Sequence, residues 1–180
     1  MLKKLVGTMA VAILIAAPVQ QAAAQVSKGY TDIGVTVGLG NVGNASLAFG
    51  GRFERIFKEL PDLGNGLLGI GVSADYYGYS DDFGPYGYDF KYIPIGATAN
   101  YHFKLENTKL DAFVGAGLGY EIISCSYRGI GYLNDYCSNS AIYFIGRVGG
   151  RYFLSEKMAL YADAGAGAAT LNVGLTFKLK

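Results

Sequence analysis

The chain has 180 residues and a formal net charge of +1, which suits a single domain and gives no support for nucleic-acid binding. Only 16% of its residues are charged, and it contains 27 Gly, 15 Tyr, 10 Phe and no Trp. Ordinary soluble domains carry about 25% charged residues and about 7% Gly, so this composition argues against a typical soluble surface.

The first predicted element is a secretory signal peptide over residues 1–24. Lys3 and Lys4 precede a largely apolar run from Leu5 to Ala17, and Ala22, Ala23 and Ala24 fit the A-x-A cleavage rule. The alternative is a membrane anchor, but an apolar run of about 13 residues is short for a span of roughly 20. We therefore expect cleavage before Gln25 and an exported domain over residues 25–180.

Eight strands are predicted after the leader, because apolar residues alternate with period two and no convincing helical period occurs. No later apolar stretch approaches about 18 residues, which excludes a helical membrane protein. Most predicted strands have 10 to 14 residues, against about five or six in soluble proteins and about 9–11 for a bilayer-crossing strand. The pattern predicts an all-β, eight-stranded, antiparallel up-and-down transmembrane β-barrel, with strands near 30–40, 45–57, 67–78, 90–103, 110–123, 141–154, 158–168 and 171–180.

Alternation separates two registers but does not say which of them faces inward. A soluble ligand-binding barrel of the lipocalin sort would hold the apolar register inside, whereas an outer-membrane barrel holds it outside. The polar register is rich in Gly and poor in Lys and Glu, and tyrosines gather near strand ends, which favours the outer membrane. A lumen charge network is then predicted, either as a structural salt-bridge core or as a gated ion path, from Arg52, Glu54, Asp75, Asp111, Glu121, Arg147, Arg151 and Asp163.

Two connections on the outward side are predicted to be long, at residues 79–89 and 124–140, because an even strand count puts both termini on the periplasmic side. The aromatic segment from Tyr76 to Tyr92 reads either as an interfacial girdle with loop packing or as a surface for a ligand. Cys125 and Cys137 flank 11 residues of the second loop, and their spacing in an exported chain predicts a disulfide. A free thiol pair or a redox site is the alternative, without the C-x-x-C spacing.

His102 is the only histidine and the one residue that could suggest an outer-membrane hydrolase. Lipid A deacylase barrels have a serine two positions after the histidine, where this chain has Lys104. One histidine without local cysteines or spaced carboxylates is also a weak metal signal. We expect a structural lumen histidine, no cofactor, no metal and no catalytic residue.

Two segments resemble a known family, namely "YIPIGATANYHF" from Tyr92 to Phe103 and the end of the chain from Met158 to Lys180. They are similar to the small eight-stranded outer-membrane proteins of Gram-negative bacteria grouped as opacity, OmpX-like and OmpA-barrel-like proteins. The resemblance implies outer-membrane location, no cofactor, and roles in surface adhesion, envelope stability or limited solute passage. It also implies an assembly signal read by the outer-membrane insertion machinery, formed by Asn172, Gly174, Phe177 and Leu179.

The expected function is that of an integral outer-membrane protein without catalysis, structural or surface-interacting through its outward loops. A narrow passive pore for small solutes or ions is the alternative, and a lipid-modifying enzyme is a more distant one. The expected partners are outer-membrane lipid, the insertion machinery and a surface ligand at residues 79–89 and 124–140, with no nucleic acid.

Overall fold

The computed structural model describes residues 26–84, 86–129 and 139–180. The predicted signal peptide lies outside these residues and stays a prediction. In the described part of the chain, no helix has the length and apolar character needed to cross a membrane. The described residues form eight strands, namely β1 (Thr31–Leu39), β2 (Ala48–Leu60), β3 (Gly66–Phe83), β4 (Tyr86–Phe103), β5 (Leu110–Arg128), β6 (Asn139–Phe153), β7 (Met158–Ala166) and β8 (Leu171–Lys178).

The strands form a closed antiparallel barrel. Each strand pairs with the next one in the chain, and β8 pairs with β1 from Asp32↔Lys178 to Leu39↔Leu171. This is the up-and-down order that the sequence predicts. Where all eight strands are present, closure pairs both edges of every strand, so the barrel wall has no free edge.

The apolar register lies on the outside of the barrel. Val35 is 61% exposed and Phe144 is 82% exposed, whereas Asp32 and Asp163 on the inner face are almost completely buried. A water-soluble barrel would have the opposite arrangement, since its apolar residues would fill the lumen. The observed faces therefore match a barrel whose wall is surrounded by lipid.

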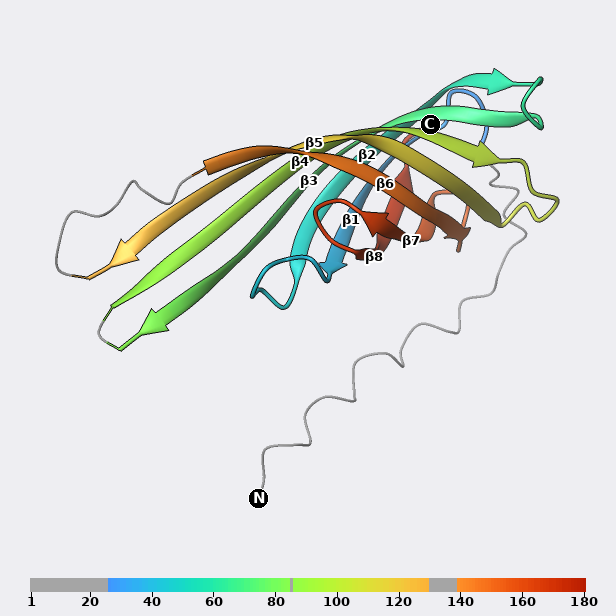
Figure 1. Ribbon diagram of the computed structural model, residues 1–180. Helices are drawn as coiled ribbons and strands as arrows, with labels where there is room; N and C mark the ends of the chain where they lie inside the picture. Colours follow the sequence, from blue (N-terminus) through green and yellow to red (C-terminus); the bar gives the residue numbers. More distant parts are fainter. Residues whose placement is uncertain (1–25, 85, 130–138) are drawn as a thin grey trace.

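Three neighbouring strands are the longest of those described. β3 and β4 have 18 residues and β5 has 19, whereas β1 and β7 have nine and β8 has eight. Figure 1 shows that β3, β4 and β5 extend together beyond the short strands, at the end away from the C-terminus. We call residues 77–83, 86–92 and 123–128 of these strands the projecting sheet.

The prediction of a loop at 79–89 is wrong, and the predicted loop at 124–140 starts too early. β3 continues to Phe83, β4 begins at Tyr86 and β5 continues to Arg128. Gly, Pro and Asp in this region read as turn residues, but cross-strand pairs such as Tyr79↔Phe90 and Tyr88↔Tyr127 keep the backbone extended. The rest of the second predicted loop, residues 130–138, lies outside the described residues.

Among the described residues, two apolar clusters lie inside the barrel, one near each end. The inner plug joins Val26 and Tyr30, which precede β1, to Ile56, Phe153 and Ala159. The backbone N–H of Gly29 donates to the Ile56 carbonyl at 2.9 Å and that of Ile56 donates to the Tyr30 carbonyl, so the segment before β1 continues the pairing with β2. The outer plug is made by Val42, Ala48, Tyr77 and Ala169.

Candidate functional site

The lumen between the two plugs holds a buried ionic cluster centred on Arg151 of β6. The Arg151 guanidinium contacts Asp32 of β1 at 3.0 Å, Asp111 of β5 at 2.6 Å, and Glu54 of β2. Its side chain is only 1% exposed, so the three carboxylates are its main polar partners, although its buried Nε makes no hydrogen bond of good geometry. One cation thus joins four strands from different parts of the ring.

His102 of β4 is a member of the same cluster. Its Nδ1 lies 2.9 Å from Asp111 and its Nε2 lies 3.1 Å from Glu54, which also accepts a hydrogen bond from Asn100. Both ring nitrogens therefore face carboxylates, and neither is directed at a serine hydroxyl. The inward register of β4 places Asn100 and His102 on this face, which is the sequence signal for their place in the cluster.

A second cluster is centred on Asp163 of β7. The Asp163 carboxylate contacts the guanidinium of Arg52 of β2 at 3.1 Å. It also contacts the guanidinium of Arg147 of β6 at 2.6 Å. Tyr161 and Asn172 donate further hydrogen bonds to the same carboxylate. The Arg147 guanidinium also donates to the Ala169 carbonyl at 2.7 Å, which ties the β7–β8 turn over the lumen.

The other two predicted network residues lie apart from these ion pairs. Asp75 lines a cavity of about 50 Å³ with Arg52 and Arg147, and Glu121 accepts a hydrogen bond from Tyr77 at 2.6 Å. No ion pair of either carboxylate is found among the described residues. Ion pairs thus occupy the middle and inner parts of the lumen. The carboxylates of Asp75 and Glu121, toward the outer end, form no ion pair among the described residues.

The residues of the predicted assembly signal all lie on β8 or directly after it. Asn172 points inward to Asp163 at 2.9 Å, while Phe177 and Leu179 are exposed on the apolar side. A Cβ on Gly174 would lie 2.0 Å from the Val35 carbonyl oxygen, so only glycine lets β8 approach β1 this closely. Asn172 and Gly174 therefore have structural roles inside the barrel and between β8 and β1.

Cys125 lies on β5 in the inward register of the projecting sheet and is 4% exposed. Cys137 lies outside the described residues, so the predicted disulfide stays a prediction.

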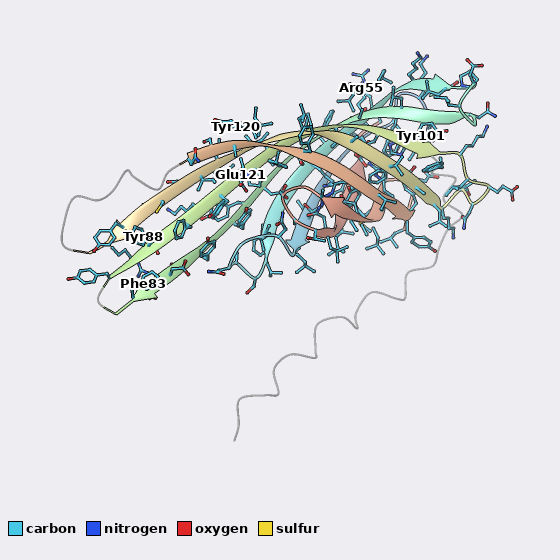
Figure 2. The ribbon with its side chains drawn as sticks, viewed as in Figure 1. Arg55, Phe83, Tyr88, Tyr101, Tyr120 and Glu121 are labelled. Atoms are coloured by element: carbon cyan, nitrogen blue, oxygen red, sulfur yellow. The ribbon has the colours of Figure 1, made fainter. Side chains whose placement is uncertain are left out.

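The outer face of β5 changes from apolar to polar along the strand. Leu118, Tyr120 and Ile122 are exposed apolar residues in this register, and the next two positions along the same face are Ser124 and Ser126. Figure 2 shows Tyr120 and the adjacent Glu121 on opposite sides of the strand. Figure 2 shows Arg55 and Tyr101 near the other end of the barrel.

The inner face of the projecting sheet carries a continuous series of aromatic rings. Tyr77 stacks on Tyr92 with ring centroids 4.7 Å apart, and Tyr79 lies 5.9 Å from Tyr92 and 5.1 Å from Phe90. The series continues toward the tip through Tyr88. We call these rings the aromatic ladder, which consists of Tyr77, Tyr79, Tyr86, Tyr88, Phe90, Tyr92 and Tyr127.

Comparison with known proteins identifies the fold. No protein-family model and no curated protein matches the sequence. The crystal structure of the N-terminal β-barrel domain of Pseudomonas aeruginosa OprF matches with a TM-score of 0.51 and 15% identity, covering 84% of this chain and 98% of that one. Ail, the attachment invasion locus protein of Yersinia pestis, crystallised with the heparin analogue sucrose octasulfate, matches with a TM-score of 0.49 and 13% identity, covering 84% and 96%. The chain has the fold of the small eight-stranded outer-membrane β-barrel proteins.

Proposed function

We propose that this protein is a non-catalytic, integral outer-membrane barrel of a Gram-negative bacterium that binds a surface partner through its projecting sheet. Residues 1–24 act as the signal peptide and residues 25–180 form the barrel. Its other partners are outer-membrane lipid, along the apolar wall, and the insertion machinery, at Asn172, Gly174, Phe177 and Leu179.

One observation carries the proposal, namely the reversal of polarity along the long strands. In the barrel the outer face is apolar, as at Leu118, and in the projecting sheet the outer face is polar, as at Ser126. The aromatic residues move to the inner face there, as Tyr127 does. A sheet that leaves the membrane and keeps its rings on one face provides a binding surface with rigid, amphipathic side chains.

The lumen supports a structural role in preference to conduction. Apolar plugs lie near both ends, and the ionic clusters around Arg151 and Asp163 lie between them, beside a cavity of only about 50 Å³. An eight-stranded barrel is only wide enough for its interior to be filled by side chains. We expect refolded protein in a planar lipid bilayer to give no steady conductance of nanosiemens size, and such a conductance would favour the pore.

Adhesion of cells that express the protein tests the surface role. Deletion of residues 81–87 removes the end of the β3–β4 hairpin, and we expect it to abolish adhesion to host or neighbouring cells. A matched control replaces residues 61–65 of the opposite turn with a Gly/Asn-rich turn of the same length, and should leave adhesion unchanged. Heat-modifiable migration on unheated gels shows that each variant is folded. Adhesion that survives the 81–87 deletion in a folded barrel would overturn the proposal.

A further inference from the structure

Acidic groups accompany the rings on the inner face of the projecting sheet. Asp81 follows Tyr77 and Tyr79 in the same register of β3, and Glu121 precedes Tyr127 in the same register of β5. Asp81 accepts a hydrogen bond from Asn44 at 3.1 Å, and Glu121 accepts one from Tyr77 at 2.6 Å. Neither carboxylate has a cationic partner in the part of the chain that the structure describes.

The cations of the projecting sheet lie on its other face. Arg128 contacts Asp89 at 3.2 Å and also pairs with Asp82, and these residues share the outer register with Lys91. The sequence between residues 129 and 140 contains no Lys or Arg, and neither does the connection over residues 40–47. The outer face is therefore close to charge balance, whereas the inner face combines aromatic rings with uncompensated negative charge.

Rings beside carboxylates recognise cations. A guanidinium or ammonium group is attracted to the ring quadrupole, and it forms a charge-assisted hydrogen bond with a carboxylate. We propose that the aromatic ladder with Asp81 and Glu121 binds Lys or Arg side chains of a cationic polypeptide segment. This inference rests on the proposed surface role and names the chemistry of the partner.

The upper part of this face is open to such a segment. Tyr86 is 46% exposed, and Tyr88, Phe90 and Tyr127 are partly exposed. The lower part is covered by the β1–β2 connection, where Val42 packs against Tyr77. Figure 2 shows Tyr88 and Phe83 at the end of the sheet farthest from Arg55 and Tyr101. A segment can therefore approach from outside along the rings, toward the carboxylates.

Peptide binding to the mature chain, refolded in neutral detergent micelles, tests the proposal. The probes are fluorescein-labelled hexalysine and hexaglutamate, and the measurement is fluorescence anisotropy. We expect hexalysine to bind and hexaglutamate not to bind. Asp81→Asn and Glu121→Gln should each weaken hexalysine binding about fivefold, which is the weakening expected when one ion pair is lost.

The two faces of the sheet supply matched controls. Asp82→Asn and Asp89→Asn make the same change in net charge on the outer face and should alter hexalysine binding less than about twofold. Tyr88→Leu should weaken it, whereas Tyr120→Leu on the outer register should not. If Asp81→Asn and Asp82→Asn weaken hexalysine binding equally, the binding depends only on net charge and the proposal is wrong. The proposal is also wrong if hexaglutamate binds as tightly as hexalysine.

Failure of this inference differs from failure of the surface role. If hexalysine does not bind, but deletion of residues 81–87 abolishes adhesion, the surface role stands and the partner is not cationic. If hexalysine binds with the expected variant pattern, but adhesion survives the deletion, the binding chemistry stands and the adhesive role is wrong.

Discussion

The barrel wall and the projecting sheet are made of the same strands, yet their two faces have opposite character. On β5, Leu118 faces out and Gly117 faces in at the level of the barrel, whereas Ser126 faces out and Tyr127 faces in farther along. The period of two is unchanged, so the backbone does not cause the reversal. The proposed membrane location accounts for it, since the outer face would then lie in lipid along the wall and in water beyond it.

The charges of the two regions differ in the same way. Arg151 is 1% exposed and holds three carboxylates inside the barrel, whereas the Arg128 side chain is 49% exposed and pairs with two on the surface. A buried pair is costly to break because the partner left behind is desolvated. An exposed pair contributes little because water and salt replace it. Loss of one ionic partner in the barrel should therefore cost more stability than loss of one in the projecting sheet.

The largest expected effect is that of Arg151→Ala. It leaves Asp32, Glu54 and Asp111 buried without their shared cation, and we expect the free energy of unfolding to fall by about 3–5 kcal/mol. Arg128→Ala is the control and should cost no more than about 1 kcal/mol. Urea unfolding of the barrel in lipid vesicles measures both. If the two variants lose similar free energies of unfolding, the ion pairs of the barrel and of the projecting sheet do not differ in strength as proposed.

A lysine on the outer face of β5 tests where the membrane ends. Leu118→Lys should lower the free energy of unfolding in vesicles by about 2–4 kcal/mol if this position is near the bilayer midplane. Ser126→Lys, on the same face of the same strand, should change it by no more than about 0.5 kcal/mol. If Leu118→Lys is tolerated as well as Ser126→Lys, the apolar register does not face lipid.

Gly174→Ala should cause the next largest loss in the free energy of unfolding. The added Cβ would lie 2.0 Å from the Val35 carbonyl oxygen and force β8 away from β1. Overpacking of this kind costs about 1–3 kcal/mol. Gly51→Ala is the matched control, since a Cβ there has its nearest contact 3.8 Å away at Gly34. Refolding without any assembly machinery, followed by urea unfolding, isolates the packing role. Equal stability of the two variants would leave only a recognition role for Gly174.

Reduction of the predicted Cys125–Cys137 disulfide should have the smallest effect on global stability. We expect no titratable thiol in non-reduced protein and two after reduction. Hydrogen exchange should become faster at residues 124–128, while residues 110–120 keep their protection, because the barrel wall does not depend on the projecting sheet. Two thiols before reduction would disprove the disulfide, and faster exchange in both segments would show that the regions are coupled.

Much of the fold can be predicted from the sequence because alternation reports which side of a strand each residue occupies. Val35, Phe53 and Val173 fall on the apolar face by counting alone, and the number and order of the strands follow. The length of β3 and β4 cannot be predicted in this way. The segment between Tyr79 and Asp89 is rich in turn residues, and only its cross-strand partners keep it extended.

Partners across the lumen are also beyond sequence reasoning. Alternation places Arg151, Asp32 and Glu54 in the inward register, but their contacts join β6 to β1 and β2 across the interior. Those contacts depend on the tilt and stagger of the strands, which fix the barrel diameter. Glu121 is an acidic residue in the inward register, like the residues that form ion pairs. It lies nearer the outer end of the barrel, where no arginine pairs with it among the described residues.

The hydrogen bonds that close the barrel join the two ends of the folded domain. The N–H of Thr31 donates to the Lys180 carbonyl at 3.1 Å, and the N–H of Leu179 donates to the Thr31 carbonyl at 2.8 Å. No other pair of strands in the ring is so far apart in sequence, and loop-closure entropy rises with that separation. The seven hairpin pairings can form locally, whereas the β1–β8 pairing needs the whole sheet to curl first. Ring closure is therefore the pairing of highest contact order, and such non-local pairings are the kind that form slowly.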